Sequence, residues 1–242
     1  HAVYTRTATE KGSWSMREKL PERWPIAYFL EGETFYNKKV SPSKISFWVR
    51  PTDFKHTGLF PEQAVNWEWI RKKLQFPISN LQEGSRPRVL NLFAYTGWAT
   101  LACLAAGAEV THVDASEGII SWAKQNAELS QLADRPVRWI VDDVMKFVAR
   151  EERRGQKYDA IIMDPPSYGR GKKNELWKLE EMLWPLLQQC RTVLCNTPLF
   201  WIINSYTTGM SSTVLKNMLA ALVLPGGKIV HGELGLRPHG EG

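Results

Sequence analysis

From Pro61 onward, short apolar segments alternate with longer amphipathic ones, and this alternation constrains the fold more strongly than any other feature of the sequence. The apolar segments are short enough for strands and lie at residues 88–93, 109–113, 137–141, 158–163, 199–204 and 228–233. Helices are expected at residues 61–74, 97–106, 116–132, 144–154, 174–193 and 211–222. Strands separated by helices pair in parallel through right-handed crossovers. The predicted fold class is therefore α/β, with a doubly wound, mostly parallel sheet.

Residues 1–58 do not follow this alternation. Three short runs of aromatic and β-branched residues, at 27–30, 34–36 and 45–49, are separated by turn-forming residues, which is typical of antiparallel strands. This part has ten Lys and Arg against six Asp and Glu, so it holds most of the net charge of +6. We therefore expect two domains: a small basic β-rich unit at residues 1–58 and an α/β domain at residues 59–242.

The charge of the N-terminal unit leaves two interpretations open. A basic excess favours polyanionic partners, with nucleic acid first among them, or it serves only to keep the surface soluble. Likewise, Trp14, Trp24 and Trp48 could stack on bases or could form the core of a small β unit.

Composition excludes several classes of protein. No uncharged apolar run approaches the ~18 residues of a membrane span, so no membrane segment is expected. The three cysteines form no CxxC pair and the five histidines form no HxxxH motif. We therefore expect no disulfide framework, no metal, and a reducing, cytoplasmic setting. The sequence begins with His1 rather than Met, so we expect that it does not start at the natural N-terminus.

An acid or an amide follows four of the first five predicted strands, namely Asp114, Asp143, Asp164 and Asn204. In a doubly wound sheet, ligands bind outside the carboxyl ends of the strands. We therefore expect these polar groups to lie along one rim and to bind a ligand there. The alternative is that the strand-end Asp residues cap the following helices, a position that Asp strongly favours.

The turn after the first predicted strand, residues 91–97, limits the kind of ligand. It contains one glycine, Gly97, beside the bulky Phe93 and Tyr95, so it lacks the G-x-G-x-x-G pattern that receives a pyrophosphate. A dehydrogenase is thus disfavoured, and the turn suits a ligand without phosphates. With an adenosyl ligand, Asp114 would accept hydrogen bonds from the ribose hydroxyls and Asp143 would accept one from the adenine amino group. Val144 would pack on the adenine ring.

Five segments, residues 91–97, 113–116, 123–126, 142–144 and 164–166, resemble the ordered motifs of class I S-adenosylmethionine-dependent methyltransferases, whose fold is Rossmann-like. Within that class they are most similar to the bacterial large-subunit ribosomal RNA methyltransferases of the 5-methylcytosine and 7-methylguanine types. Residues 57–63 also resemble the segment before the core of that group, although Ala64 stands where the group has Arg. The resemblance spans about residues 55–233.

The resemblance implies that S-adenosyl-L-methionine is the cofactor and that a defined set of residues lines its pocket. By motif position these are Phe60, Gln63, Phe93, Tyr95, Gly97, Asp114, Ala115, Asp143, Val144 and Asp164. The implied catalytic residues are Asp164, Pro165 and Tyr168. The two prolines of Asp-Pro-Pro fix the backbone, so the Asp164 carboxylate and the Pro165 carbonyl can hold the N–H of a target nitrogen.

The residues near the predicted catalytic edge bear on the methylated atom. Methylation of cytosine carbon needs a Cys nucleophile, and the corresponding places hold Ser167 and Ser205, so nitrogen or oxygen targets remain. Arg170, Lys172 and Lys173 follow Tyr168 in a glycine-flanked loop, which could bind phosphates while Tyr168 stacks on a flipped base, or could be a solvated loop.

The sequence therefore predicts a methyltransferase that acts on a base nitrogen of RNA, with ribosomal RNA as the candidate substrate. RNA is the expected partner, bound through Arg170, Lys172, Lys173 and the N-terminal unit. Two other classes stay open: a methyltransferase for a small molecule or a protein, and a non-catalytic RNA-binding protein that keeps the fold.

Overall fold

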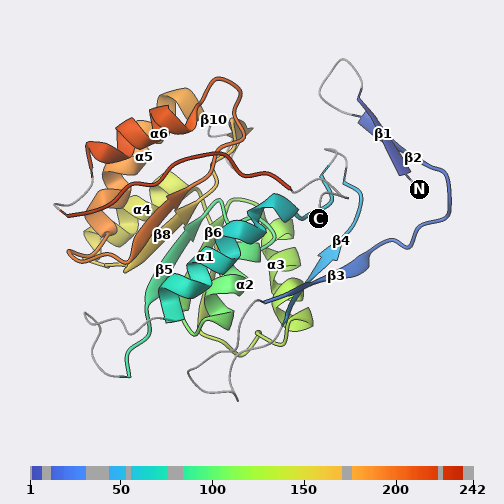
Figure 1. The fold of residues 1–242 in the computed structure, drawn as a ribbon, viewed down its shortest axis with the longest axis horizontal. Helices are drawn as coiled ribbons and strands as arrows, with labels where there is room; N and C mark the ends of the chain where they lie inside the picture. Colours follow the sequence, from blue (N-terminus) through green and yellow to red (C-terminus); the bar gives the residue numbers. More distant parts are fainter. Residues whose placement is uncertain are drawn as a thin grey trace, which may run out of the picture.

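A computed structural model describes residues 2–6, 12–30, 44–52, 56–75, 84–170, 176–222 and 226–236. Its centre is a sheet of five parallel strands in the order β11-β8-β5-β6-β7 (Figure 1). These strands are β5 (Arg88–Leu92), β6 (Glu109–Asp114), β7 (Val137–Val141), β8 (Ala160–Met163) and β11 (Phe200–Ile203). The strand order reverses between β5 and β8, which confirms the predicted doubly wound α/β fold.

The two faces of the sheet are covered by different helices because side chains alternate along each strand. Val89 of β5 joins a core cluster with residues of α1 (Ala64–Gln75), α2 (Trp98–Ala105) and α3 (Glu117–Leu129). Its neighbour Leu90 joins a second cluster with α4 (Val144–Arg153) and α5 (Leu179–Val193). The short helix η1 (Pro61–Gln63) precedes α1, and α6 (Ser212–Ala220) lies outside α5 (Figure 1).

The helix predicted from Pro61 is present as η1 and α1, and its buried face is formed by Trp67, Ile70 and Leu74. These residues recur at the three- and four-residue spacing of an amphipathic helix. Trp67 packs against Tyr28 and Phe47, with ring centroids 5.2 and 5.4 Å away. Contacts with the N-terminal strands thus decide which face of the helix is buried.

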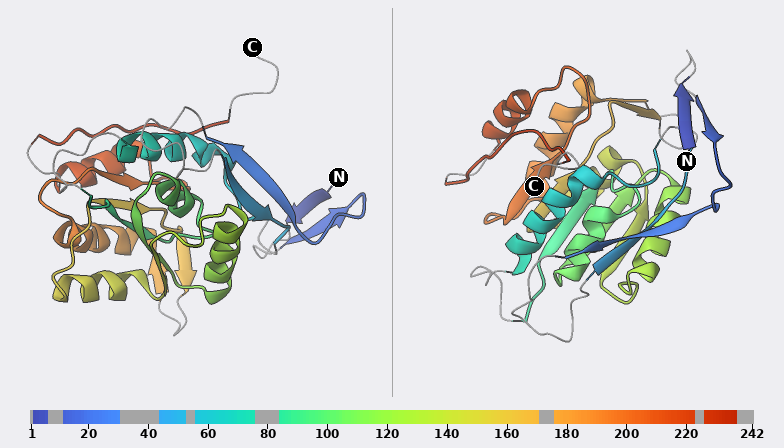
Figure 2. Two further views of the ribbon diagram at one scale, coloured as in Figure 1. Left: turned by 90° about the horizontal axis from the view of Figure 1, so that it is seen from below. Right: turned by 45° about the vertical axis from the view of Figure 1, so that its right-hand side comes forward.

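Two antiparallel hairpins form the N-terminal part, and they relate differently to the sheet. The hairpin β3 (Trp24–Phe29) and β4 (Lys44–Val49) packs on the main domain, where Ile45 and Phe47 are fully buried in the α1–α2 cluster. The hairpin β1 (Ala2–Arg6) and β2 (Gly12–Met16) extends from the body (Figure 2). The predicted run at 34–36 lies outside the described residues. The β4 strand therefore completes the core of the α/β domain, and the division at residue 58 stays a prediction.

Two predicted elements near the C-terminus were wrong. The helix expected from residue 174 begins at Leu179, because residues 176–178 form β10 (Leu176–Lys178), which pairs with β9 (Tyr168–Arg170). The indole of Trp177 donates to the Pro166 carbonyl at 2.6 Å and holds this hairpin against the loop after β8. The strand expected at 228–233 is absent: described residues 226–236 pair with no strand, and Val230 is 82% exposed.

Gly58 fixes the approach of the segment before η1 to α3. Its φ is +90°, and a Cβ built there would lie 2.3 Å from the Trp122 ring. Its carbonyl accepts a hydrogen bond from the Thr96 hydroxyl at 2.6 Å. Only glycine meets both the backbone conformation and the close contact at this position.

We expect Gly58→Ala to lower the free energy of unfolding by about 2–4 kcal/mol, because it adds a steric overlap to the strain of a positive φ. Urea unfolding followed by circular dichroism measures the change. Gly155→Ala is the matched control: Gly155 also has a positive φ, but nothing lies within 4 Å of an added Cβ. It should lose only about 1 kcal/mol. Equal losses for the two variants would contradict the packing role of Gly58.

Candidate functional site

The rim formed by the carboxyl ends of the parallel strands carries the predicted site. At the switch point, the turn after β5 has three residues with positive φ: Phe93 at +52°, Tyr95 at +49° and Gly97 at +89°. Non-glycine residues rarely adopt this conformation, and such strain is concentrated at functional sites. A Cβ on Gly97 would lie 3.1 Å from the Ala123 Cβ, so the start of α2 can approach α3 only with glycine there.

Asp114, at the end of β6, is held against this turn by two backbone N–H groups. Its Oδ2 accepts from Tyr95 N at 3.0 Å, and its Oδ1 accepts from Ser116 N at 2.9 Å. Burial raises the pKa of Asp114, while these backbone hydrogen bonds oppose the rise. The carboxylate is therefore oriented at the rim, with lone pairs left on both oxygens for a ligand.

The end of β7 shows the capping alternative in use. Asp143 accepts from Lys146 N at 2.9 Å through Oδ1 and so caps α4. Asp142 accepts from Asp143 N at 2.8 Å and forms an ion pair with Arg150, while its own N–H donates to the Asp114 carbonyl at 3.0 Å. The backbone thus places Asp143 next to the end of β6, with Val144, 4% exposed, directly after it.

Asn126 of α3 braces the turn from the side. Its Nδ2 donates to the Thr96 carbonyl at 2.9 Å, and its Oδ1 accepts from Trp48 N at 2.8 Å. Asn126 is fully buried, so both hydrogen bonds are shielded from water. One side chain therefore links β4, α3 and the strained turn.

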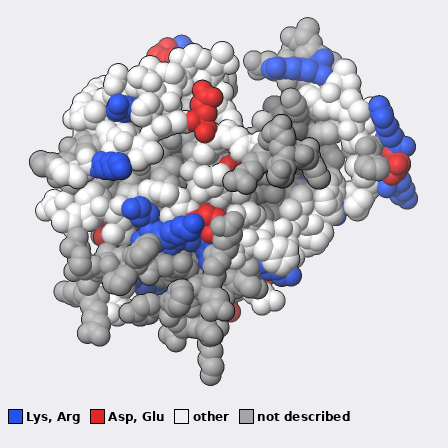
Figure 3. All heavy atoms as spheres, in the orientation of Figure 1, with Lys and Arg blue, Asp and Glu red and all other residues white. Residues whose placement is uncertain are grey.

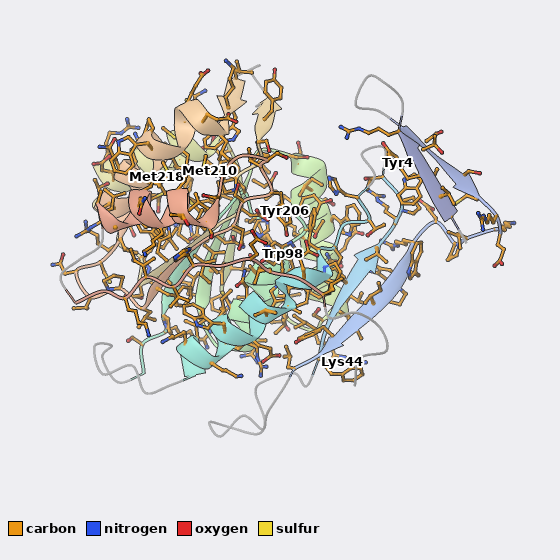
Figure 4. All side chains as sticks on the ribbon, turned by 45° about the horizontal axis from the view of Figure 1, so that its top comes forward. Tyr4, Lys44, Trp98, Tyr206, Met210 and Met218 are labelled. Carbon is orange, nitrogen blue, oxygen red and sulfur yellow. The ribbon has the colours of Figure 1, made fainter. Side chains whose placement is uncertain are left out.

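A second group of polar residues at the rim was not foreseen as a unit. Tyr206 donates to Glu62 Oε1 at 2.9 Å and accepts from Gln63 Nε2 at 2.8 Å. Asn66 donates to Gln63 Oε1 at 2.7 Å and to Asn204 Oδ1 at 3.0 Å. The network connects η1 and α1 to the loop after β11. In the view of Figure 4, Tyr206 lies between Met210, which comes just before α6, and the buried Trp98.

Phe60 packs against the Tyr206 ring of this network and against Tyr95. Its ring centroid lies 5.2 Å from that of Tyr206 and 5.9 Å from that of Tyr95. The structure thus brings Phe60 and Gln63 next to the strained turn, as the motif order implied. The Phe93 ring contacts Trp177, with ring centroids 4.8 Å apart. Glu62, Asn66 and Tyr206 were missed as site residues, whereas Asn204 was expected at the rim from its strand-end position.

Asp164 follows β8 and faces the same network. Burial, together with the charge of Glu62, raises the pKa of Asp164 to about 7. Asp164 also raises the pKa of Tyr206, although burial of that phenol is the larger cause. Two carboxyl groups and a phenol therefore share one corner of the rim, and Asp164 can change its protonation state near neutral pH.

The remaining predicted residues lie beside Asp164. Pro165 is buried, and Tyr168, in β9, is 55% exposed. The Ser167 hydroxyl lies 2.6 Å from the Thr207 hydroxyl and links the loops after β8 and β11. Lys172 and Lys173, and the side chain of Arg170, lie outside the described residues. The exposed Tyr168 ring is thus available at the edge where Asp164 lies.

The rim has the features of a site for a phosphate-free nucleoside. It combines an oriented carboxylate at Asp114 with a turn after β5 that packs closely on α3 at Gly97. The buried apolar residue Val144 follows β7, two strands from β5. No glycine-rich cradle of backbone N–H groups for a pyrophosphate follows β5. The fold and the rim therefore define a Rossmann-like protein of the methyltransferase class.

Comparisons with known proteins identify the family. Residues 25–199 match the sequence model described as S-adenosylmethionine-dependent methyltransferase. The chain belongs to this family, and its cofactor is S-adenosylmethionine. The family predicted from the sequence motifs is thereby confirmed.

Two kinds of relative support this assignment. A crystal structure of a SAM-dependent methyltransferase from Agrobacterium tumefaciens is 40% identical, with a TM-score of 0.77, over 90% of this chain and 63% of that one. Ribosomal RNA large subunit methyltransferase K/L of Hahella chejuensis is 30% identical over 68% of this chain and 21% of its own length. The protein of that name from Magnetococcus marinus is 36% identical over 55% of this chain and 17% of its own length. The chain thus spans about a fifth of the length of these curated relatives.

Two features are absent from the described part of the chain. None of its helices is long and apolar enough to cross a membrane. The same residues contain no group of three His, Cys, Asp or Glu side chains placed to hold a metal ion.

We expect Asp164→Asn to stabilise the protein at high pH. A raised carboxyl pKa makes a contribution to stability that is complete below the unfolded pKa near 4 and is lost as pH rises towards about 7. The amide avoids this loss. The difference in free energy of unfolding between the variant and wild type should therefore move in favour of the variant by about 2–4 kcal/mol from pH 4 to pH 8. Urea unfolding at both pH values measures this. Asp134→Asn, at an exposed position, is the control and should show no such difference.

We expect Asp114→Ala to weaken binding of S-adenosylhomocysteine by about 1.5–3 kcal/mol, because a charged hydrogen-bond acceptor is lost. Calorimetric titration gives the affinity. Asp134→Ala serves as the control and should bind as wild type does. Unchanged affinity in Asp114→Ala would remove Asp114 from the cofactor pocket.

Proposed function

We propose that this protein methylates a nitrogen of an RNA base, with ribosomal RNA as the substrate. The observation that carries the proposal is the Asp164 carboxyl group, which lies half-buried at the rim, beside Glu62, with a pKa of about 7. A nitrogen nucleophile must lose an N–H proton during methylation, and a carboxylate with a pKa near neutrality suits that transfer.

We propose that the predicted pocket residues hold the cofactor at the rim. Asp114 would accept the ribose hydroxyls, while Asp143 and Val144 would contact the adenine. Phe60, Gln63, Phe93, Tyr95, Gly97, Ala115 and Asp164 would form the remaining walls. S-adenosylmethionine supplies a methyl carbon already activated by a sulfonium, so most of the catalysis comes from positioning the target.

The catalytic roles follow from the positions at the corner of β8 and β11. The Asp164 carboxylate would accept the proton of the target nitrogen, and the Pro165 carbonyl would orient that N–H. Tyr168, which is 55% exposed, would stack on the flipped base. Glu62 stands close enough for its charge to act on Asp164, so it would tune the pH at which Asp164 ionises.

The cysteines support a nitrogen over a carbon target. Covalent carbon methylation needs a thiolate at the reacting edge. Cys103 and Cys190 are fully buried, and burial raises the pKa of both thiols. Cys195 follows α5 at the opposite end of the strands, where its N–H donates to the Tyr158 carbonyl. The three free cysteines also accord with the proposed cytoplasmic setting.

RNA is favoured by the basic charge and by the names of the relatives. The chain carries a net charge of +6 and matches proteins named as ribosomal RNA large subunit methyltransferases. On the face drawn in Figure 3, Lys and Arg side chains stand on the β1–β2 hairpin and at separate places on the body. Such charges bind phosphates without regard to sequence.

The test of this function supplies labelled cofactor with separate fractions of ribosomal RNA, tRNA, protein and small metabolites. Label is expected in the RNA, and mass spectrometry of the hydrolysed RNA should identify an N-methylated nucleoside. Label in protein or metabolites, or a C-methylated nucleoside, would overturn the proposal.

The turnover number should rise with pH through about 7 and then level off, because Asp164 must be ionised to accept a proton. Asp164→Asn should lose most of the turnover and the pH dependence together. Glu62→Gln removes the charge that helps raise the pKa of Asp164. The midpoint of this variant's pH profile should therefore move to lower pH, while its turnover number at high pH is retained. A midpoint that is unchanged in Glu62→Gln would contradict the coupling.

A further inference from the structure

A hollow on the outer side of α3, here called the α3 notch, lies apart from the residues assigned to the cofactor and to the methyl transfer. It forms where α3 meets β4 and the chain beside that strand. Its lining includes Arg23, Trp48, Arg50, Gly118, Ser121 and Trp122.

Each arginine of the notch lies over the ring of a tryptophan. The Arg23 guanidinium carbon is 4.3 Å from the centroid of Trp48, and that of Arg50 is 4.4 Å from the centroid of Trp122. Stacking of this kind fixes the plane of a guanidinium and leaves its N–H edge open. Gln125 accepts one hydrogen bond from Arg23, at 2.6 Å. Among the described residues, neither arginine forms an ion pair with a carboxylate, although both are exposed.

The floor of the notch is rigid. Trp122 is 5% exposed, and its indole N–H donates to the Trp48 carbonyl at 2.9 Å. Gly58 also lies close to the Trp122 ring, because a Cβ built on it would be 2.3 Å away. The two stacking surfaces are therefore fixed relative to each other by α3 and β4, and they are in place before any ligand binds.

The notch opens beside the rim. Burial and the Asp114 carboxylate raise the pKa of Tyr95 to about 12, and the charge of Arg50 opposes this rise, so Arg50 lies near the strained turn. Gly118 and Ser121 belong to the first half of α3, which begins three residues after Asp114. A group held in the notch would therefore lie near the turn after β5, on the α3 side of the rim.

We propose that the α3 notch binds a phosphodiester of the RNA substrate, through the guanidinium groups of Arg23 and Arg50. This inference rests on the proposed function, because it assumes that the substrate is RNA. Two planar donors that form no ion pair with any carboxylate of the described residues match the oxygens of a phosphate. The contact would hold the RNA backbone at the α3 side of the rim without reading its sequence.

The experiment compares Arg23→Gln/Arg50→Gln with a control that loses the same charge elsewhere. Arg153→Gln/Arg191→Gln is suitable, because these residues lie in the last turns of α4 and α5, at the opposite edge of the sheet. Fluorescence anisotropy with a fluorescein-labelled 12-nucleotide single-stranded RNA gives the affinity over a range of salt concentrations. Thermal melting and binding of S-adenosylhomocysteine verify that each variant is folded.

The notch variant should bind the RNA about 10- to 100-fold more weakly than wild type. Its affinity should also fall less steeply with salt, by about 1.4 in the logarithmic slope, because two phosphate contacts of about 0.7 each are lost. The control variant should change the affinity by less than about threefold. Equal effects of the two variants would overturn the notch as a site.

A second pair of variants avoids removing the stacked arginines. Ser121 is exposed in the lining of the notch, so Ser121→Asp places a negative charge beside the bound phosphate, while Ser121→Asn is the neutral match. Ser121→Asp should weaken RNA binding by about tenfold relative to Ser121→Asn. Displacement of the RNA probe by micromolar inorganic pyrophosphate would instead mean that the notch takes a small phosphorylated ligand, and it would overturn the proposal.

The outcomes separate this inference from the proposed function. Methylation of RNA by wild type, with equal RNA binding by the notch variant, would overturn the notch and leave the function intact. RNA binding that depends on the notch, without methylation of any RNA, would overturn the function and support the notch. Absence of RNA binding by wild type would overturn both.

Discussion

The Asp114 carboxylate organises the rim, because each of its oxygens accepts a backbone N–H from a different segment. One hydrogen bond fixes the strained turn after β5, and the other fixes the start of α3. A half-buried acceptor with two donors has a well-defined orientation, and its hydrogen bond to Tyr95 N supports a turn with positive φ values. The same carboxylate therefore fixes the shape of the rim.

A second constraint comes from the segment before α1. Gly58 allows this segment to lie against Trp122, and the Gly58 carbonyl accepts a hydrogen bond from Thr96. These contacts place Phe60 and Gln63 at the rim. Asn126 ties the same turn to β4. The N-terminal hairpin β3–β4 is thus a structural part of the site, and the α3 notch forms where this hairpin meets α3.

The rim also holds an electrostatic conflict. Asp164 and Glu62 are two acids in one partly buried corner, and neither has a basic partner among the ion pairs of the described residues. Such an arrangement is unfavourable for folding at neutral pH, but it gives a carboxyl group that can exchange a proton there. The basic residues of the notch lie on the outer side of α3, so acidic chemistry and cationic binding are separated in space.

The sequence by itself determined the α/β fold, the parallel strands and the polar residues at their ends, because apolar periodicity and strand-end positions are local properties. It also indicated Gly97, Asp114 and Asp164. Only the tertiary structure decided the β9–β10 hairpin, the absence of a strand at 228–233, and the buried face of α1, since each depends on contacts with distant segments. The Glu62–Tyr206 network and the α3 notch join residues more than seventy positions apart, and no local pattern records such pairings.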